Sequence, residues 1–324
     1  MTFDKPTPIR DGFGKALLEL GEKNPNVVVL TADLSEAIRT HWFAEKFPQR
    51  FFQMGIAESD MMGTAAGLSI AGKVPFVTTF AAFATSLANT PVRVSVAYNQ
   101  AKVKIATSHG GVCVGGDGAT HQSIEDIALM RVLPGMTIVV PCDANEAYKA
   151  TLAVAEYPGP VYLRLGRIAT PIVTAPKTPF KIGKAQVLEQ GEDLAIIACG
   201  AMVGLALEAA QLLKNKGVST RVINMHTVKP LDKRAVLKAA EECGALVTVE
   251  EHSIIGGLGS AVAELVAETS PVPVERVGIR DVFGESGEPN EILEKYGLTT
   301  KDLVASCKRA LERKESMVRS KSHA

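Results

Sequence analysis

The sequence is poor in aromatic residues and cysteines, carries no net charge and has no long apolar run. Basic and acidic side chains number 35 each, so there is no bulk attraction to nucleic acid or to an anionic membrane. Aromatic residues make up 5%, with one tryptophan, which argues against a stacking platform for single-stranded nucleic acid. The longest apolar run, between Asp193 and Glu208, is too short and too rich in glycine and alanine to span a bilayer.

The cysteines point to a reducing compartment. All five are scattered without close pairs, at positions 113, 142, 199, 243 and 307. Such spacing argues against a disulfide framework and against a zinc knuckle. The first ten residues contain no apolar segment of the kind that directs secretion. We therefore expect a cytoplasmic protein that binds neither nucleic acid nor a membrane.

Strand-like and helix-like segments alternate along the first half of the chain. Runs rich in valine, isoleucine and threonine predict buried parallel strands at 26–33, 74–80, 102–108, 136–142 and 159–165. Between these runs, helical composition is found at 60–72, 83–100 and 144–157. A segment with three prolines and no amphipathic period, 168–184, is predicted to be a linker.

The alternation resumes after this linker. Strands are predicted at 193–200, 219–226, 245–251 and 273–279, and helices from Met202, Asp232, Gly259 and Asp302. The basic tail, 311–324, is expected to fray after a final helix. The pattern predicts an α/β fold of two doubly wound domains with mainly parallel sheets, covering residues 1–178 and 179–324.

Two features of the first domain are candidates for a binding site. Glu58 begins a helical stretch among small residues, where an acid is favoured by the helix dipole and where small residues suit close packing. Phe80 and Phe83 directly follow a strand, and their spacing would place both rings on one helical face. Taken alone, the two rings are also explained by core packing.

A glycine-rich loop, 108–126, lies between a predicted strand and a helix. It contains His109, Asp117 and His121 among five glycines. Glycines let the backbone approach a ligand closely, and functional side chains favour loops at the end of a rigid sheet. A zinc site built from these three residues would lack further ligands, so we expect no metal site made by this chain.

Four segments, in order, resemble the pyrimidine-binding half of the transketolase family of thiamine diphosphate enzymes. They are MGIAES at 54–59, TTFAAF at 78–83, HGGVCVGGDGATHQ at 109–122 and GPVYLRLGR at 159–167. The segment VTVEEHSIIGGLGSAVAEL, at 247–265, resembles the C-terminal domain of that family. The resemblance covers almost the whole chain and implies these two domains in this order.

The resemblance implies that Glu58, Phe80 and Phe83 bind the cofactor, thiamine diphosphate. Glu58 would be the catalytic carboxylate that hydrogen-bonds the aminopyrimidine ring and favours its imino form. Phe80 and Phe83 match the aromatic residues that lie against this ring, with Phe83 as the stacking partner. Ser86 stands where the family often has a further aromatic residue.

The resemblance also implies substrate contacts from the glycine-rich loop. Asp117 would receive a sugar hydroxyl, and His121 would act in catalysis by binding the hydroxyls of the donor and of the intermediate. His109 would join Arg167 and Arg10 at the phosphate end of the substrate, where the planar fork of arginine suits a phosphate.

The phosphate end leaves two points open. The sequence does not decide whether Arg164 or Arg167 faces the substrate. The serine that the family has at this end is replaced near Ala37, with Ser35 close by, so the resemblance to a conventional sugar-phosphate site is incomplete there.

Two short glycine motifs are expected not to be binding sites for a diphosphate or a dinucleotide. Gly116 to Gly118, followed by Asn145, resembles a GDG…N signature for Mg²⁺ and diphosphate, but Asp117 lies in the sugar-contacting loop and Asp143 or Asn145 is placed to cap a helix. GGLGSA, at 256–261, lacks the last glycine of a dinucleotide fingerprint and suits strand-to-helix packing or a dimer contact. His226 and His252 are expected to be structural or interface residues.

Because the sequence has no other GDG, we expect a separate N-terminal subunit to hold the diphosphate and Mg²⁺. The resemblance implies the C-terminal subunit of a split transketolase, which moves a two-carbon ketol unit between small phosphorylated sugars in an α2β2 assembly. The alternatives are the β subunit of a 2-oxoacid dehydrogenase, half of an enzyme similar to deoxyxylulose-phosphate synthase, and a catalytically silent assembly subunit. The DGATHQ loop and Arg167 favour a sugar phosphate, and Glu58 with the two histidines argues against a silent chain.

Overall fold

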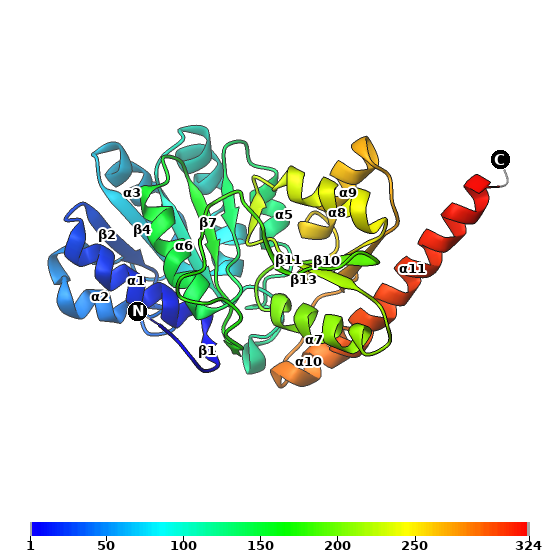
Figure 1. Ribbon diagram of the computed structural model, residues 1–324. Helices are drawn as coiled ribbons and strands as arrows, with labels where there is room; N and C mark the ends of the chain where they lie inside the picture. Colours follow the sequence, from blue (N-terminus) through cyan, green and yellow to red (C-terminus); the bar gives the residue numbers. More distant parts are fainter. Residues whose placement is uncertain (1, 323–324) are drawn as a thin grey trace.

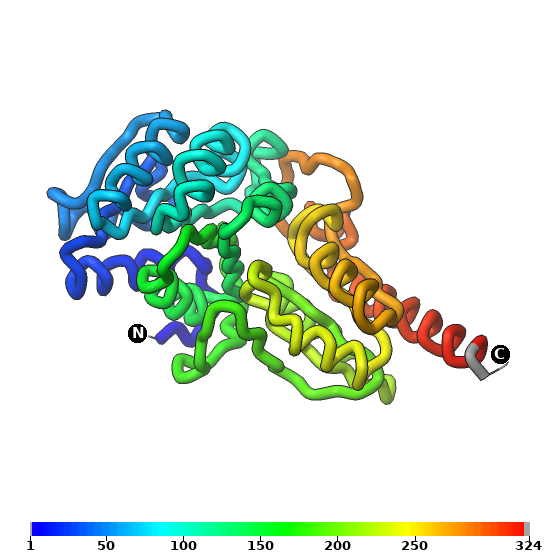
Figure 2. The backbone as a smooth tube through the Cα atoms, turned by 90° about the horizontal axis from the view of Figure 1, so that it is seen from above, coloured from blue at the N-terminus to red at the C-terminus, as the bar shows by residue number. Residues whose placement is uncertain are grey.

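The computed structural model describes residues 2–322 and contains two α/β domains side by side (Figure 1). Seen from above, the first (blue to green) and the second (yellow to red) form separate lobes (Figure 2). The larger sheet has the order β12 (Thr227–Lys229), β6 (Thr137–Val139), β7 (Val161–Arg164), β5 (Lys104–Ser108), β4 (Val74–Phe80), β2 (Val27–Thr31) and β3 (Phe51–Gln53). All neighbours in it are parallel except β12 and β6.

Helices cover both faces of this sheet. One face carries α1 (Ile9–Lys23) and α6 (Ala144–Glu156), which pack on each other and on every second residue of the central strands. The alternate strand residues pack against α3 (Glu58–Ile70), η3 (Val92–Tyr98) and α5 (Asp126–Arg131). Shorter elements complete the domain: β1 (Thr7–Pro8), α2 (His41–Lys46), η1 (Pro48–Arg50), η2 (Phe83–Leu87), α4 (Asn89–Pro91), η4 (Gly115–Asp117) and β8 (Ala169–Thr170).

The second sheet has the order β14 (Val274–Ile279), β13 (Leu246–Ser253), β10 (Leu194–Ala198), β11 (Thr220–Asn224) and β9 (Gln186–Glu189). Only β9 is antiparallel to its neighbour. The surrounding helices are α7 (Met202–Lys214), α8 (Lys233–Cys243), α9 (Leu258–Thr269), α10 (Pro289–Lys295) and α11 (Thr300–Ser322).

One hydrophobic core runs from the first domain into the second. It joins Ile138 and Met130 of the first to Ile197, Met225 and Leu258 of the second. The strand β12 also joins the two domains, because it belongs to the second half of the chain but pairs with β6 of the larger sheet. A shared core and a shared sheet hold the two domains together.

The α/β fold with mainly parallel sheets is confirmed, and every predicted strand is present. The short strands β3, β9 and β12 were not predicted. The segment predicted as one helix at 83–100 is largely the wider π-helix, in η2 and η3.

The prediction that the tail frays is wrong for the described residues. The helix α11 continues to Ser322, and its last turns project away from the body (Figure 1). This part of the chain contains no glycine or proline, and it is tied back to the second sheet where Lys314 Nζ donates to the carbonyls of Asp193 and Cys243 at 2.8 Å each. Residues 323–324 lie outside the described part. Nowhere in residues 2–322 is a helix both long and apolar enough to cross a membrane.

Candidate active site

The candidate residues gather where the parallel strands of the larger sheet end. Phe80 ends β4, Ser108 ends β5 and Arg164 ends β7, so the segments that follow these strands leave the same edge of the sheet. In open α/β sheets, ligands bind at this carboxyl edge. Phe83, His109 and Arg167 come directly after the three strand ends.

Four rings form a cluster at this edge. The rings of Phe80 and His109 stack with centroids 3.8 Å apart, and Phe80 and Phe83 lie 5.8 Å apart with nearly parallel planes. His121 closes the group, with its ring steeply inclined to those of Phe83 and Phe80 and centroid distances of 5.2 and 6.2 Å. The structure therefore brings together Phe80, Phe83, His109 and His121, which lie up to 41 positions apart in the sequence (121 − 80).

His109 is an uncharged ring at neutral pH. Burial is the main cause that lowers its pKa, to about 3, and the positive charges of Arg10 and Arg167 add to the effect. Its Nδ1 lies 2.7 Å from the hydroxyl of Ser108. Its backbone is left-handed, with φ of 61°, so the ring is held in a conformation that few residues adopt without support from their surroundings.

Two arginines act electrostatically on His109 of this cluster. Arg10, at the start of α1, donates from Nη1 to the carbonyl of Ala37 at 2.8 Å, while its buried Nε has no hydrogen-bond partner among the described residues. Arg167 is half-buried and donates to the carbonyl of Val114. Both cations act on His109, so this end of the site attracts an anion.

Arg164 is not at this end of the site. It is buried, and its Nε lies 2.6 Å from Asp126 Oδ2 in an ion pair. Its Nη2 donates to the carbonyls of Ser123 and Glu251. The structure thus distinguishes between the two arginines that the sequence left open: Arg164 is paired with Asp126, whereas the charge of Arg167, like that of Arg10, acts on His109.

Glu58 is the first residue of α3, and it contacts the residue that precedes Phe80 on β4. Its side chain is only 5% exposed, and Thr79 Oγ1 donates to its Oε1 at 3.4 Å. Thr79 precedes Phe80 on β4. Within residues 2–322, Glu58 forms no ion pair and accepts no other hydrogen bond, although an ionised carboxylate is costly to bury without partners. The site therefore keeps a carboxylate that has capacity to bind a ligand.

Asp117 and Ser86 do not join the cluster. Both are exposed, and within the described part of the chain no hydrogen bond ties the side chain of Asp117 to another residue. Asp117 ends the short turn η4. The first residue of that turn, Gly115, has φ of 85°, and a Cβ there would lie 2.5 Å from Arg167 Nη1.

Residues of the two glycine motifs make structural contacts, and the prediction that Asp143 or Asn145 caps a helix is confirmed for Asp143. Asp143 caps α6 by accepting from Glu146 N at 2.7 Å, and Asn145 bonds to the backbone of Phe3 and Thr174. In the second motif, the backbone N–H groups of Leu258 and Gly259 donate to Glu250 at 2.7 Å each. Because this carboxylate occupies the N-terminus of α9, a dinucleotide phosphate has no place there.

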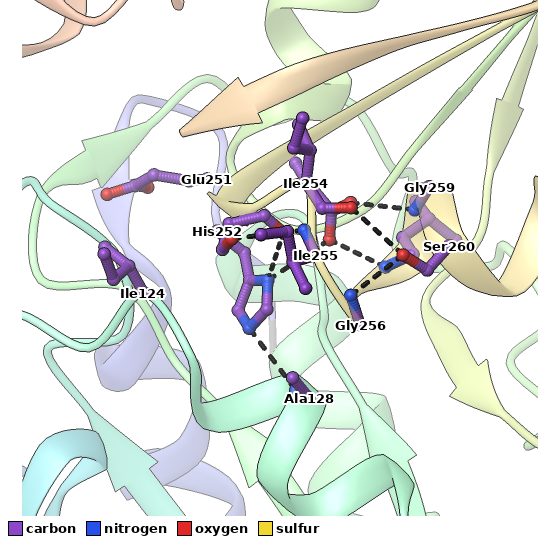
Figure 3. Close-up of polar contacts among 12 residues, drawn as sticks. Ile124, Ala128, Glu251, His252, Ile254, Ile255, Gly256, Gly259 and Ser260 are labelled. Atoms are coloured by element: carbon purple, nitrogen blue, oxygen red, sulfur yellow. Dashed lines mark hydrogen bonds and ion pairs between the residues drawn. The ribbon is translucent and has the colours of Figure 1, made fainter. Parts of the chain in front are cut away.

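His226 and His252, in the second half of the chain, are buried. His252 reaches across to α5, where Ala128 N donates to its Nε2 at 3.4 Å (Figure 3). His226 stacks on Phe180 with centroids 4.3 Å apart, and burial lowers its pKa to about 4. Both are therefore structural, and His252 lies at the contact between the two domains.

Several residues beside the site were not predicted from the sequence. Thr79 bonds Glu58, Asp126 pairs with Arg164, and Glu251 accepts from the glycine-rich loop. The available signal for the last was two adjacent acids, Glu250 and Glu251, within an otherwise apolar strand segment, since buried acids need specific partners.

Comparisons with known proteins agree on the family. Residues 5–172 match the pyrimidine binding domain of transketolase, and residues 183–303 match the transketolase C-terminal domain. The chain is 46% identical over 293 residues to a putative transketolase C-terminal section of Methanocaldococcus jannaschii, covering 90% of this chain and 92% of that protein. It is 43% identical to the 6-deoxy-6-sulfo-D-fructose transketolase subunit SqwH of a Clostridium species, covering 94% and 95%.

A solved structure is similar over nearly its whole length. It is described as a split gene transketolase in an inactive β4 tetramer, and it is 50% identical with a TM-score of 0.89, covering 95% of this chain and 99% of that one. Both domain matches and these relatives give the same assignment: the chain belongs to the transketolase family and contains its pyrimidine-binding and C-terminal domains.

Proposed function

We propose that this chain is the C-terminal subunit of a split, thiamine diphosphate-dependent transketolase. It would help to transfer a two-carbon ketol unit from a ketose phosphate to an aldose phosphate. The observation that carries the proposal is the buried, cation-free carboxylate of Glu58, bonded to the residue before Phe80, together with the cluster of four rings and the charges of Arg10 and Arg167 that act on His109. We divide the chain into a pyrimidine-binding domain, 1–178, and a C-terminal domain, 179–324.

The residues at the site fit the pyrimidine ring of the cofactor. Phe80 and Phe83 offer flat apolar surfaces, and Glu58 offers a buried carboxyl that can share a proton with a ring nitrogen. When bound, thiamine diphosphate supplies the carbon nucleophile that carries the two-carbon unit. Glu58 would contribute by holding a proton at that ring nitrogen.

The other residues fit a polyhydroxylated anion. The rings of His109 and His121 can exchange hydrogen bonds with sugar hydroxyls, His109 as a neutral group, and Asp117 can accept from a further hydroxyl. Arg10 and Arg167 would bind the anionic end. One relative is named for a sulfo sugar, so the anionic group is a point to test rather than to assume. The carbonyl of Ala37, where the family has a serine nearby, is taken by Arg10.

A partner subunit completes the proposal. The N-terminal subunit would hold the diphosphate and Mg²⁺, because the sequence has no GDG motif besides the one in the glycine-rich loop. The two kinds of subunit would form an α2β2 heterotetramer. The similar split gene transketolase is described as inactive in its β4 form, which supports inactivity of this chain by itself. The five cysteines are buried and unpaired, which supports a cytoplasmic assembly.

The test is reconstitution. The purified chain with thiamine diphosphate and Mg²⁺ should give no ketol transfer, and adding the diphosphate-binding subunit should give turnover with xylulose 5-phosphate as donor. Acetyl transfer from pyruvate would instead indicate an enzyme similar to deoxyxylulose-phosphate synthase, and acyl transfer to lipoyl from a 2-oxoacid would indicate a dehydrogenase subunit. Full ketol transfer by the chain alone would overturn the proposal.

We expect the partner to cover an apolar face next to the site. The helix α3 packs beside η2, α4 and η3, and Ser59 Oγ donates to the Leu87 carbonyl at 3.0 Å near Glu58. Leu87 is 63% exposed there, and added Cβ atoms at Gly63 and Gly67 would meet nothing within 4 Å. Glycine inside a helix costs about 1 kcal/mol, and no packing within this chain requires it at these two positions.

Leu87→Asp is therefore expected to prevent assembly without unfolding the chain. A charge in the centre of an apolar interface has no partner, whereas an exposed substitution changes stability by only about 0.5 kcal/mol. The measurement is co-elution of the two subunits by size exclusion. Leu212→Asp, at a leucine 46% exposed on α7, is the control and should still co-elute. Unimpaired assembly of the Leu87 variant would place the interface elsewhere.

A further inference from the structure

The second domain holds the glycine-rich loop of the active site through one carboxylate. Glu251, on β13, is buried, and its Oε1 accepts from the backbone N–H groups of Val112 and Cys113 at 2.8 Å each. Gly111 has φ of 98°, and a Cβ there would lie 2.2 Å from Glu251 Oε1. The loop thus has a glycine, Gly111, at the position where the Glu251 carboxylate approaches its backbone.

The two ends of this loop carry the histidines of the site. Gly111 N donates to the Ser123 carbonyl at 2.7 Å, and Ser123 N donates back at 3.2 Å, so the loop is closed at its base. Gln122 Nε2 then donates to the carbonyls of Val112 and Glu285. His109 precedes this base by two residues, and His121 is next to Gln122. A shift of the anchor would therefore move both rings against Phe80 and Phe83.

The adjacent acid makes the same kind of contact within its own domain. Glu250 is buried and accepts from two backbone N–H groups at the start of α9, and a Cβ on Gly257 would lie 2.0 Å from its Oε2. Burial raises the pKa of both carboxyls. Successive strand residues point to opposite sides, and in Figure 3 Glu251 points away from Gly259 and Ser260. The two acids differ mainly in which domain they bind.

We propose that Glu251 is a positioning residue for the active site: it fixes the glycine-rich loop, and with it His109 and His121, from the C-terminal domain. This inference rests on the proposed function for its effect on substrate, but the anchoring itself does not. The C-terminal domain would thereby contribute to substrate binding without contacting substrate or cofactor.

The first arm of the test is amide hydrogen exchange on the purified full chain. In Glu251→Ala, exchange at Val112 and Cys113 should be about tenfold faster or more, because both buried donors lose their acceptor. Glu251→Gln keeps an acceptor oxygen and should stay close to wild type. Glu250→Ala is the matched control and should leave the loop protected. If the Ala variant does not fold, Glu251→Asp gives the same readout, because its carboxylate is one methylene shorter.

The second arm is steady-state kinetics of the reconstituted complex. Glu251→Ala should raise the donor KM about tenfold or more through misplacement of the loop, with Glu250→Ala within about twofold of wild type. Equal exchange or equal KM changes in the two Ala variants would reduce Glu251 to a general stabilising residue and overturn the proposal, as would unchanged exchange at Val112 and Cys113. If the wild-type complex has no ketol transfer, the proposed function fails, and the exchange arm still decides the anchoring.

Discussion

Glu58→Gln is expected to abolish ketol transfer by the reconstituted enzyme while leaving subunit assembly intact. The amide has the shape of the carboxyl but cannot hold and release a proton, and acid–base catalysis by a positioned group contributes about a hundredfold to ten-thousandfold. We therefore expect kcat to fall by about a thousandfold. Because Glu58 forms no ion pair within residues 2–322 and accepts only one weak hydrogen bond, its replacement should cost the fold little.

The measurement is turnover with xylulose 5-phosphate, together with size exclusion of the mixed subunits. Asp60→Asn is the matched control, because Asp60 is an exposed acid in the same first turn of α3. This control should keep nearly full turnover. Unchanged turnover in the Glu58 variant would remove the basis for a catalytic chain and would favour the silent assembly subunit.

Arg164→Ala and Arg167→Ala are expected to fail in opposite ways. Arg164 is paired with Asp126, which also accepts from Tyr162 Oη at 2.6 Å. Burial alone would raise the pKa of Asp126, but Arg164 and then His252 outweigh it and leave this pKa below its ordinary value. Removing Arg164 leaves a charge buried without its partner, which costs about 3–5 kcal/mol.

Thermal unfolding is the measurement for Arg164→Ala, and the Tm should fall by roughly 10 °C. Because the pKa of Asp126 is lowered in the folded chain, the pair stabilises at neutral pH and this stability is lost only as the pH falls below about 3.8. The variant should therefore differ most from wild type near neutrality and least in acid. A Tm unchanged at pH 7 would contradict the buried pair.

Arg167→Ala should instead leave the Tm nearly unchanged and raise the donor KM. A hydrogen bond to a charged group is worth about 1.5–3 kcal/mol, which corresponds to roughly a tenfold to hundredfold weaker binding. Donors with and without a terminal phosphate distinguish the cause, because only the phosphorylated donor should lose affinity. Equal loss for both donors would show that Arg167 acts on the loop through Val114 rather than on the anion.

The strand pattern of this chain is local information, which explains why it could be predicted. Each buried strand is a short run of β-branched residues bounded by polar or turn residues, as in 74–80 and 161–164. The short strands β3 and β12 have no such run. They pair because a neighbouring strand presents free backbone groups, and that depends on how distant segments pack.

The site divides in the same way. The sequence by itself determined which residue types occur at the ends of the strands: Glu58, the two phenylalanines, and a loop with His109 and His121 among glycines. Chain order along parallel strands was enough to place these segments at one edge. It could not place Asp117, which lies exposed and apart from the ring cluster.

Only the tertiary structure decided which charged groups belong to the site and which support it. Arg164 and Arg167 are three residues apart, yet one is buried against Asp126 and the other acts by its charge on His109. Glu250 and Glu251 are adjacent, yet they bind different domains. The physical reason is that a side chain's partners are set by what packs on its face of the strand or loop, and those of Glu251 lie up to 139 residues away. Spacing along the chain contains no record of that packing.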